Sequence, residues 1–188
     1  YKRLGRTGLE VSVACLGCGG SSALGRSIGK SEEYSINLVK QALDLGVNFL
    51  DTANVYGTEK IVGKAIKNIN RDQIIISTKH QIATKDKKYS YKDIINGMEN
   101  SLKELNTDYI DIFHLHGVAP KDFDHAITII PELLKEKDKL NDKALLFAAI
   151  AYLHPTSLDS KYLAEIPGEL QTQILQKINE LLFPTVYV

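Results

Sequence analysis

The chain has 188 residues, a length that fits one domain with a sizeable hydrophobic core or two small units. Its 23 Lys and Arg residues balance its 23 Asp and Glu residues, so net charge favours neither nucleic acid nor an anionic membrane as a partner. The longest apolar run, over 144–153, is about half the roughly 20 residues that a membrane helix needs, and the N-terminus carries no apolar signal segment. We therefore expect a cytoplasmic protein without a membrane or nucleic-acid partner, although the first residue is not Met and a preceding segment stays open.

Predicted strands and helices alternate through the first part of the chain. A short hairpin over 4–11 comes first, and the glycine-rich segment 17–22 after the first core strand allows a ligand or backbone to approach closely. The core strands are predicted at 13–17, 48–51, 73–79 and 109–116, and the helices at 31–45, 58–68, 91–105 and 127–137. Short connections between alternating strands and helices predict parallel βαβ units, in an α/β sheet that is either open or closed into a barrel.

The pattern changes after about residue 140. The segment 144–152 is apolar and rich in Ala, which fits either a buried helix or a strand. The segment 166–183 places Leu170, Ile174, Ile178 and Leu181 on one helical face and predicts an amphipathic helix. We therefore expect two parts, an α/β part over 1–139 and a divergent, mostly helical tail over 140–188.

Polar residues fall at or just after the predicted ends of three strands. Asp51, Lys79 and His116 end these strands, and Tyr56 lies in the loop after Asp51. The carboxyl ends of parallel strands share the edge where α/β proteins bind ligands. A phenol titrates near pH 10, so Tyr56 needs a neighbouring cation such as Lys79 to act as an acid at neutral pH. Asp51 would hold Lys79 in place, and His116 would orient a carbonyl. Each residue alone is more often structural, but the set predicts acid-assisted addition to a carbonyl, and reduction would need a nicotinamide cofactor as hydride source.

Patterns that suggest metal or phosphate sites are incomplete. Cys15 and Cys18 have zinc-ligand spacing, but no second pair exists and residues three apart on a strand face opposite sides, so we expect buried thiols. His114 and His116 would point the same way from one strand, without a third ligand in register. The glycines of segment 25–31 are one residue too close for a P-loop. We expect no metal site.

Several motifs follow one another between about residues 4 and 137. They are Leu4-Gly5-x-Thr7-Gly8-Leu9-x-Val11-Ser12, Asp51-Thr52-Ala53-x-x-Tyr56-Gly57-x-Glu59-x-x-x-Gly63, Ser77-Thr78-Lys79 and Asp111-x-x-x-Leu115-His116. In this order and spacing they resemble the aldo-keto reductase family. The resemblance implies a TIM barrel that reduces aldehydes or ketones to alcohols with NADPH. It implies Tyr56 as the general acid, Lys79 and Asp51 as the groups that lower its pKa, and His116 beside the substrate carbonyl. It further implies that Gly20 and Ser21, with Asp51, contact the nicotinamide end of the cofactor.

The resemblance covers only the N-terminal half of such a barrel. A TIM barrel takes about 250 residues, and about four βα units can be recognised here, so we expect an incomplete barrel with a helical C-terminal tail. The parts of the dinucleotide site that the resemblance implies beyond Leu140 are not recognisable in the sequence. Open sheet edges would favour self-association. Two functions stay open: an NADPH-dependent carbonyl reductase impaired by loss of the second half barrel, or a non-catalytic remnant or interaction module of the same descent.

Overall fold

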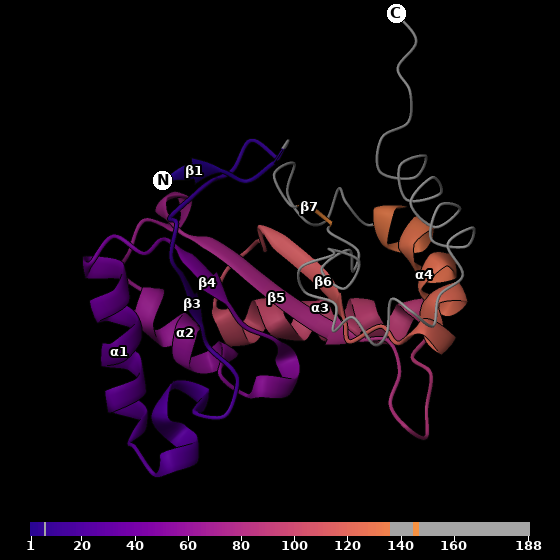
Figure 1. Cartoon of the computed structure of the whole chain (residues 1–188), viewed down its shortest axis with the longest axis horizontal. Coiled ribbons are helices and arrows are strands. Elements are labelled where there is room, and N and C mark those ends of the chain that lie inside the picture. The colour runs from indigo at the N-terminus through magenta and orange to yellow at the C-terminus, as the bar shows by residue number, and fades with distance from the viewer. Residues whose placement is uncertain (6, 136–144, 147–188) are drawn as a thin grey trace, which may run out of the picture.

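A five-stranded parallel sheet, in the order β3-β4-β5-β6-β7, forms the centre of the computed structural model, which describes residues 1–5, 7–135 and 145–146 (Figure 1). Its strands are β3 (Cys15–Gly17), β4 (Phe49–Asp51), β5 (Ile75–Gln81), β6 (Ile112–His116) and β7 (Leu145–Leu146). The helices are α1 (Glu32–Asp44), α2 (Glu59–Ile66), α3 (Tyr91–Leu105) and α4 (Phe123–Lys135), and short 3-10 helices lie at η1 (Ala23–Ile28), η2 (Asn54–Tyr56), η3 (Arg71–Gln73) and η4 (Pro120–Asp122). The alternation confirms the predicted parallel α/β class.

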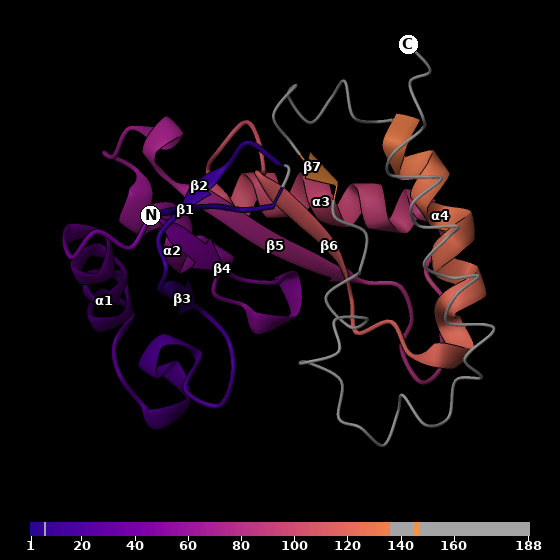
Figure 2. The same ribbon diagram turned by 45° about the horizontal axis from the view of Figure 1, so that its top comes forward.

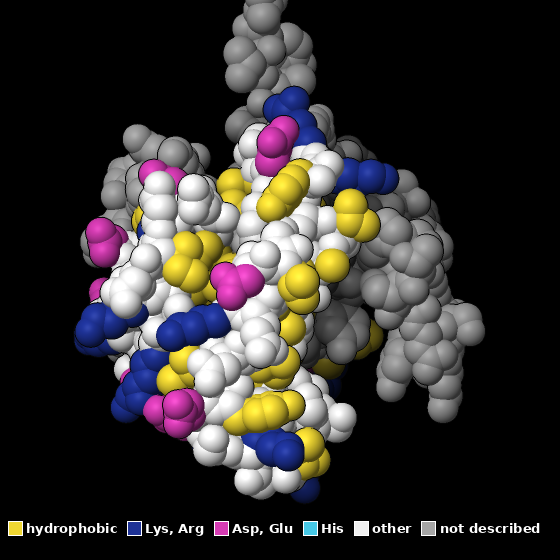
Figure 3. Space-filling view, turned by 90° about the vertical axis from the view of Figure 1, so that its left-hand side faces the viewer, with side chains coloured by type: hydrophobic (Ala, Val, Ile, Leu, Met, Phe, Trp, Pro, Cys, Tyr) yellow, Lys and Arg dark blue, Asp and Glu magenta, His cyan; other side chains and the backbone are white. Residues whose placement is uncertain are grey.

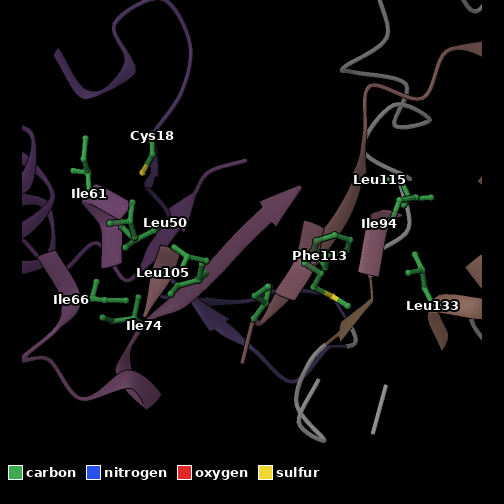
Figure 4. Close-up of a cluster of buried hydrophobic side chains, with 14 of the residues drawn as sticks. Cys18, Leu50, Ile61, Ile66, Ile74, Ile94, Leu105, Phe113, Leu115 and Leu133 are labelled. Carbon is green, nitrogen blue, oxygen red and sulfur yellow. The ribbon is translucent and has the colours of Figure 1, made fainter. Parts of the chain in front are cut away.

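One face of the sheet packs against the helices. Alternate residues of a strand point to opposite faces, and Leu50, Ile76 and Phe113 belong to the face that meets the main hydrophobic core. Successive helices pack side by side, α1 on α2, α2 on α3 and α3 on α4, as Figure 2 shows from a second direction. The core between these layers includes the labelled side chains of Figure 4, which are Cys18, Leu50, Ile61, Ile66, Ile74, Ile94, Leu105, Phe113, Leu115 and Leu133.

The opposite face of the sheet, which we call the inner face, is apolar at one end and polar at the other. Strand pairing places on it Cys15, Gly17, Phe49, Asp51, Ile75, Ser77, Lys79, Gln81, Ile112, His114 and His116. At its amino-terminal end, Ile75 and Ile112 pack with Val11 of a short antiparallel hairpin, β1 (Lys2–Arg3) and β2 (Glu10–Val11). The hairpin therefore covers the apolar end, and the polar residues remain at the carboxyl end.

Most predicted elements are confirmed, and several boundaries differ. Helix α1 begins after Ser31, whose side chain accepts a hydrogen bond from the Tyr34 amide, and α3 covers the predicted range, with Ser90 and Asp93 forming a capping box. Strand β3 is shorter than predicted, β5 runs two residues further than the predicted strand, and α4 begins at Phe123 rather than near residue 127. The predicted tail helix over 166–183 lies outside the described residues.

Charges of both signs are mixed on the side of the molecule that α1 occupies. Figure 3 shows Lys and Arg side chains lying among Asp and Glu side chains and scattered hydrophobic ones. The exposed hydrophobic residues include Ile28, Tyr34 and Leu45. Within the described ranges, no helix is both long enough and apolar enough to cross a membrane.

Candidate functional site

The polar residues predicted to form a site do converge at the carboxyl end of the sheet. Asp51 is the last residue of β4, His116 is the last residue of β6, and Tyr56 ends η2. Lys79 lies inside β5 rather than at its end, because β5 continues to Gln81. Pairing of Asp51 with Ser77 and of Lys79 with His114 brings the three strands into a register that groups these side chains on the inner face.

An ion pair between Lys79 and Asp51 lies at the centre of this group. Lys79 Nζ donates to Asp51 Oδ2 at 2.6 Å and to the carbonyl oxygen of Thr52 at 2.8 Å. The side chains are 16% and 32% exposed, respectively, so the pair is partly shielded from water. Two acceptors therefore fix the ammonium group beside the carboxylate.

The Tyr56 ring lies against both Lys79 and His116. Lys79 Nζ is 5.4 Å from the centroid of the ring, and the His116 ring meets it edge-on with centroids 5.5 Å apart. The loop that carries Tyr56 ends at Gly57, which has a left-handed backbone with φ 64°. Arg26 Nη1 of η1 donates to the Gly57 carbonyl oxygen at 2.7 Å, so the loop is held from the β3 side as well.

Buried polar contacts hold the other end of this loop on the far face of the sheet. Thr52 Oγ1 and Thr58 Oγ1 lie 3.1 Å apart, and Thr78 Oγ1 donates to Glu59 Oε1 at 2.6 Å. Burial raises the pKa of the Glu59 carboxyl, although the hydrogen bond from Thr78 opposes the shift. The start of α2 is thereby attached to β5, directly behind the Tyr56 loop.

The segment after β3 passes over the Tyr56 ring and leaves open space beside it. A Cβ atom at Gly19 would lie 2.5 Å from Cε2 and 2.8 Å from Cγ of Tyr56, so the ring packs on the bare backbone of this glycine. Gly20 has φ +71°, and a Cβ there would meet nothing within 4 Å; Ser21 is exposed. The Cys18 amide donates to the Asp51 carbonyl oxygen at 2.8 Å, which holds this segment next to Asp51.

The His116 ring is neutral and can form a hydrogen bond with an uncharged group of a bound molecule. Burial lowers the pKa of His116, and the Lys79 ammonium lowers it further, so the ring is neutral at pH 7. Its Nδ1 atom is buried and has no hydrogen-bond partner among the described residues. A buried polar atom without a partner is unusual, and it leaves a hydrogen-bonding position for a bound molecule.

Ser77 and His114, which sequence reasoning did not assign to the site, extend it beneath Asp51. Ser77 Oγ donates to Asp51 Oδ1 at 2.7 Å and lies 3.0 Å from His114 Nε2. Burial, followed by the Lys79 ammonium, lowers the pKa of His114 to about 4. The only sequence signal was alternation, since Ser77 and His114 each stand two residues before Lys79 and His116 on the same strand face.

Only one of the two cysteine thiols is buried, whereas both were expected to be. Cys18 is buried, as predicted, but Cys15 is exposed because it lies on the inner face of the edge strand β3. Burial chiefly raises the pKa of the Cys18 thiol, to about 12, so this thiol stays protonated at neutral pH. No cluster of three or more metal-binding side chains occurs in the part of the chain that the structure describes.

Among known protein families, the model described as "Aldo/keto reductase family" matches residues 15–145 of the chain. Aldo-keto reductase YhdN of Bacillus subtilis is 39% identical over 130 residues, which cover 64% of this chain and 38% of that protein. A probable voltage-gated potassium channel subunit beta of Arabidopsis thaliana is 36% identical over 155 residues, covering 78% of this chain and 44% of that protein. The chain therefore spans less than half the length of these curated relatives.

The solved structures extend the match to the fold. The thermostable aldo-keto reductase Tm1743, crystallised with the inhibitor epalrestat, superposes with a TM-score of 0.65 at 25% identity, covering 94% of this chain and 58% of that one. This likeness confirms that the parallel sheet and its helices form part of a TIM barrel. With a family model matched over most of its length, the chain belongs to the aldo/keto reductase family, whose members generally bind a nicotinamide cofactor.

Proposed function

We propose that this protein reduces the carbonyl group of a small aldehyde or ketone to an alcohol, with NADPH as the reductant. The observation that carries the proposal is the Lys79–Asp51 ion pair, 2.6 Å long, beside the ring of Tyr56. A cation held next to a phenol is what proton donation by tyrosine at neutral pH requires.

In the proposed reaction Tyr56 is the general acid. Its hydroxyl gives a proton to the carbonyl oxygen, and the Lys79 ammonium stabilises the phenolate that remains. Asp51 holds Lys79 in place through their ion pair. The neutral ring of His116 orients the carbonyl oxygen through a hydrogen bond. The products are an alcohol, the oxidised cofactor and a tyrosinate that regains its proton from water.

The cofactor is assigned to the open segment after β3. Gly20 and Ser21, with Asp51, would contact its nicotinamide end, where a Cβ atom at Gly20 would meet no atom of the described residues within 4 Å. When bound, NADPH supplies the hydride that the carbonyl carbon accepts. The preference for NADPH over NADH and the cytoplasmic location are parts of the same proposal, and they rest on the family resemblance and on the composition of the chain.

Two measurements on the full chain test the proposal. Titration with NADPH, followed by cofactor fluorescence, should show saturable binding, and a test aldehyde should then consume NADPH. Tyr56→Phe should lower kcat by about 10² to 10⁴, the range for a general acid, with nearly unchanged NADPH affinity. Tyr34→Phe, at a half-exposed tyrosine of α1, is the matched control and should keep full activity. Turnover that survives Tyr56→Phe would refute the assigned acid.

The alternative is a non-catalytic member of the family. It is favoured by the similarity to a relative that is named as a channel subunit rather than as an enzyme. No NADPH binding at millimolar concentration would support this alternative over the reductase. Strand β3 is an edge of the described sheet, so the same preparation should be tested for self-association by measuring its mass in solution.

A further inference from the structure

A row of hydrogen bonds runs across three strands beneath the proposed acid. It begins at His114 on β6, passes through Ser77 on β5 at 3.0 Å, and reaches Asp51 Oδ1 on β4 at 2.7 Å. The other carboxylate oxygen, Oδ2, accepts from Lys79. Both oxygens of Asp51 therefore have a donor from β5, and the row continues one strand further to His114.

The direction of each hydrogen bond follows from counting protons. An ionised carboxylate can only accept, so the single hydroxyl proton of Ser77 points to Asp51. Ser77 Oγ must then accept from His114, which places a proton on His114 Nε2. This excludes the neutral tautomer that carries its proton on Nδ1.

The surroundings of His114 keep its ring neutral. The charged and titratable groups around it are Lys79, Asp51 and His116, and the ammonium of Lys79 opposes a second positive charge. Burial has the larger effect and, with Lys79, lowers the pKa of His114 to about 4. At pH 7 the ring is thus a neutral donor, and its protonation state does not change near neutral pH.

We propose that Ser77 and His114 are positioning residues, which act on the reaction only by holding the Asp51 carboxylate toward Lys79. This inference rests on the proposed function, because it gives these residues a role in that proton transfer. Without the Ser77 hydroxyl, Asp51 Oδ1 loses its donor and the carboxylate is free to turn about its terminal torsion, which is a broad, weakly restricted rotation. Lys79 would then be held less firmly beside the Tyr56 ring.

Kinetics of variants test the role. Ser77→Ala should lower kcat by about 10 to 100-fold, the effect of losing a hydrogen bond to a charged group, with little change in KM. Ser77→Thr keeps the hydroxyl and should recover most of the lost rate. In an Asp51→Asn background, Ser77→Ala should have almost no further effect, because residues that act through one another are not additive.

A matched control separates this role from simple loss of stability. Ser90→Ala removes the serine that caps α3 and should destabilise the fold without changing kcat of the folded enzyme. The inference is overturned if Ser77→Ala keeps the wild-type kcat, or if its effect is fully additive with Asp51→Asn.

A readout that needs no turnover is the imidazole nitrogen spectrum of the histidine-labelled chain. His114 should show one neutral ring protonated at Nε2, and Ser77→Ala should convert it to a mixture of tautomers. A wild-type ring protonated at Nδ1 would overturn the inference, because Ser77 could not then donate to Asp51. If the wild-type chain reduces no carbonyl, the proposed function fails, and the spectrum still decides whether this row of hydrogen bonds exists.

Discussion

Replacement of Gly19 by alanine should displace the Tyr56 ring and impair the proposed reaction. The new methyl group would lie 2.5 Å from Tyr56 Cε2 and closer still to Cδ2, whereas carbon atoms pack at about 3.5 Å or more. The ring must therefore move by about 1 Å. A misplacement of this size costs about 100-fold in rate when a reacting group is involved, and the added crowding costs about 1–3 kcal/mol of stability.

The assay for Gly19→Ala combines turnover with a structural signal. Aldehyde reduction should fall by about 100-fold, and the ring resonances of His116 should shift, because its edge-on contact with Tyr56, at 5.5 Å between centroids, is lost. Gly97→Ala is the matched control, since its methyl group would clash with the His80 ring on α3's side of the sheet. Wild-type turnover in Gly19→Ala, or an equal loss in Gly97→Ala, would refute the reasoning.

Two further predictions concern stability. The pKa of His114 is lowered to about 4 from its ordinary 6.5. Between these two pH values the unfolded chain binds a proton at His114 and the native state does not. The free energy of unfolding should therefore fall as the pH drops through this range, by about 1.4 kcal/mol per pH unit. Urea unfolding at pH 7 and pH 5 should show a smaller drop for His114→Gln, and identical drops would contradict the assignment. Arg71→Ala should cost about 3–5 kcal/mol, because it leaves Asp111, 5% exposed, without its ion-pair partner at 2.5 Å. The double variant Arg71→Ala with Asp111→Leu should unfold at higher urea than Arg71→Ala alone, and a further loss would show that the unpaired charge is not the cause.

Hydrophobic spacing was enough to predict the helices that cover the sheet. Helix α3 was placed correctly because its apolar residues keep one helical face and Ser90 provides a cap. The strand at 73–79 was displaced, since Gln73 belongs to the turn η3, where the Asn70 side chain accepts from the Asp72 amide. The strand continues instead through polar residues to Gln81, because β6 pairs with it as far as Gln81, which lies opposite His116. Hydrophobic patterns in the sequence therefore cannot identify polar residues that lie inside a sheet.

The convergence of Asp51, Tyr56, Lys79 and His116 was predictable because all four were expected at the carboxyl edge of the sheet, although Lys79 lies inside β5 rather than at its end, while their roles stay predictions. Ser77 and His114 could not be assigned in the same way, because their hydrogen bonds join three strands and depend on register, which no single segment reveals. The role of Gly19 could not be predicted from the sequence either, because the Tyr56 ring that packs on it comes 37 positions later.

Successive side chains of β5 point to opposite faces of the sheet and so contact different groups. Ser77 and Lys79 face Asp51, whereas Thr78, between them, faces Glu59 at the start of α2. Substitutions of Ser77 or Lys79 should therefore change the proposed proton transfer while leaving the attachment of α2 to β5 intact. Those at the even-numbered positions will change how tightly the helix layer is held, so a library that randomises the whole strand would mix the two effects.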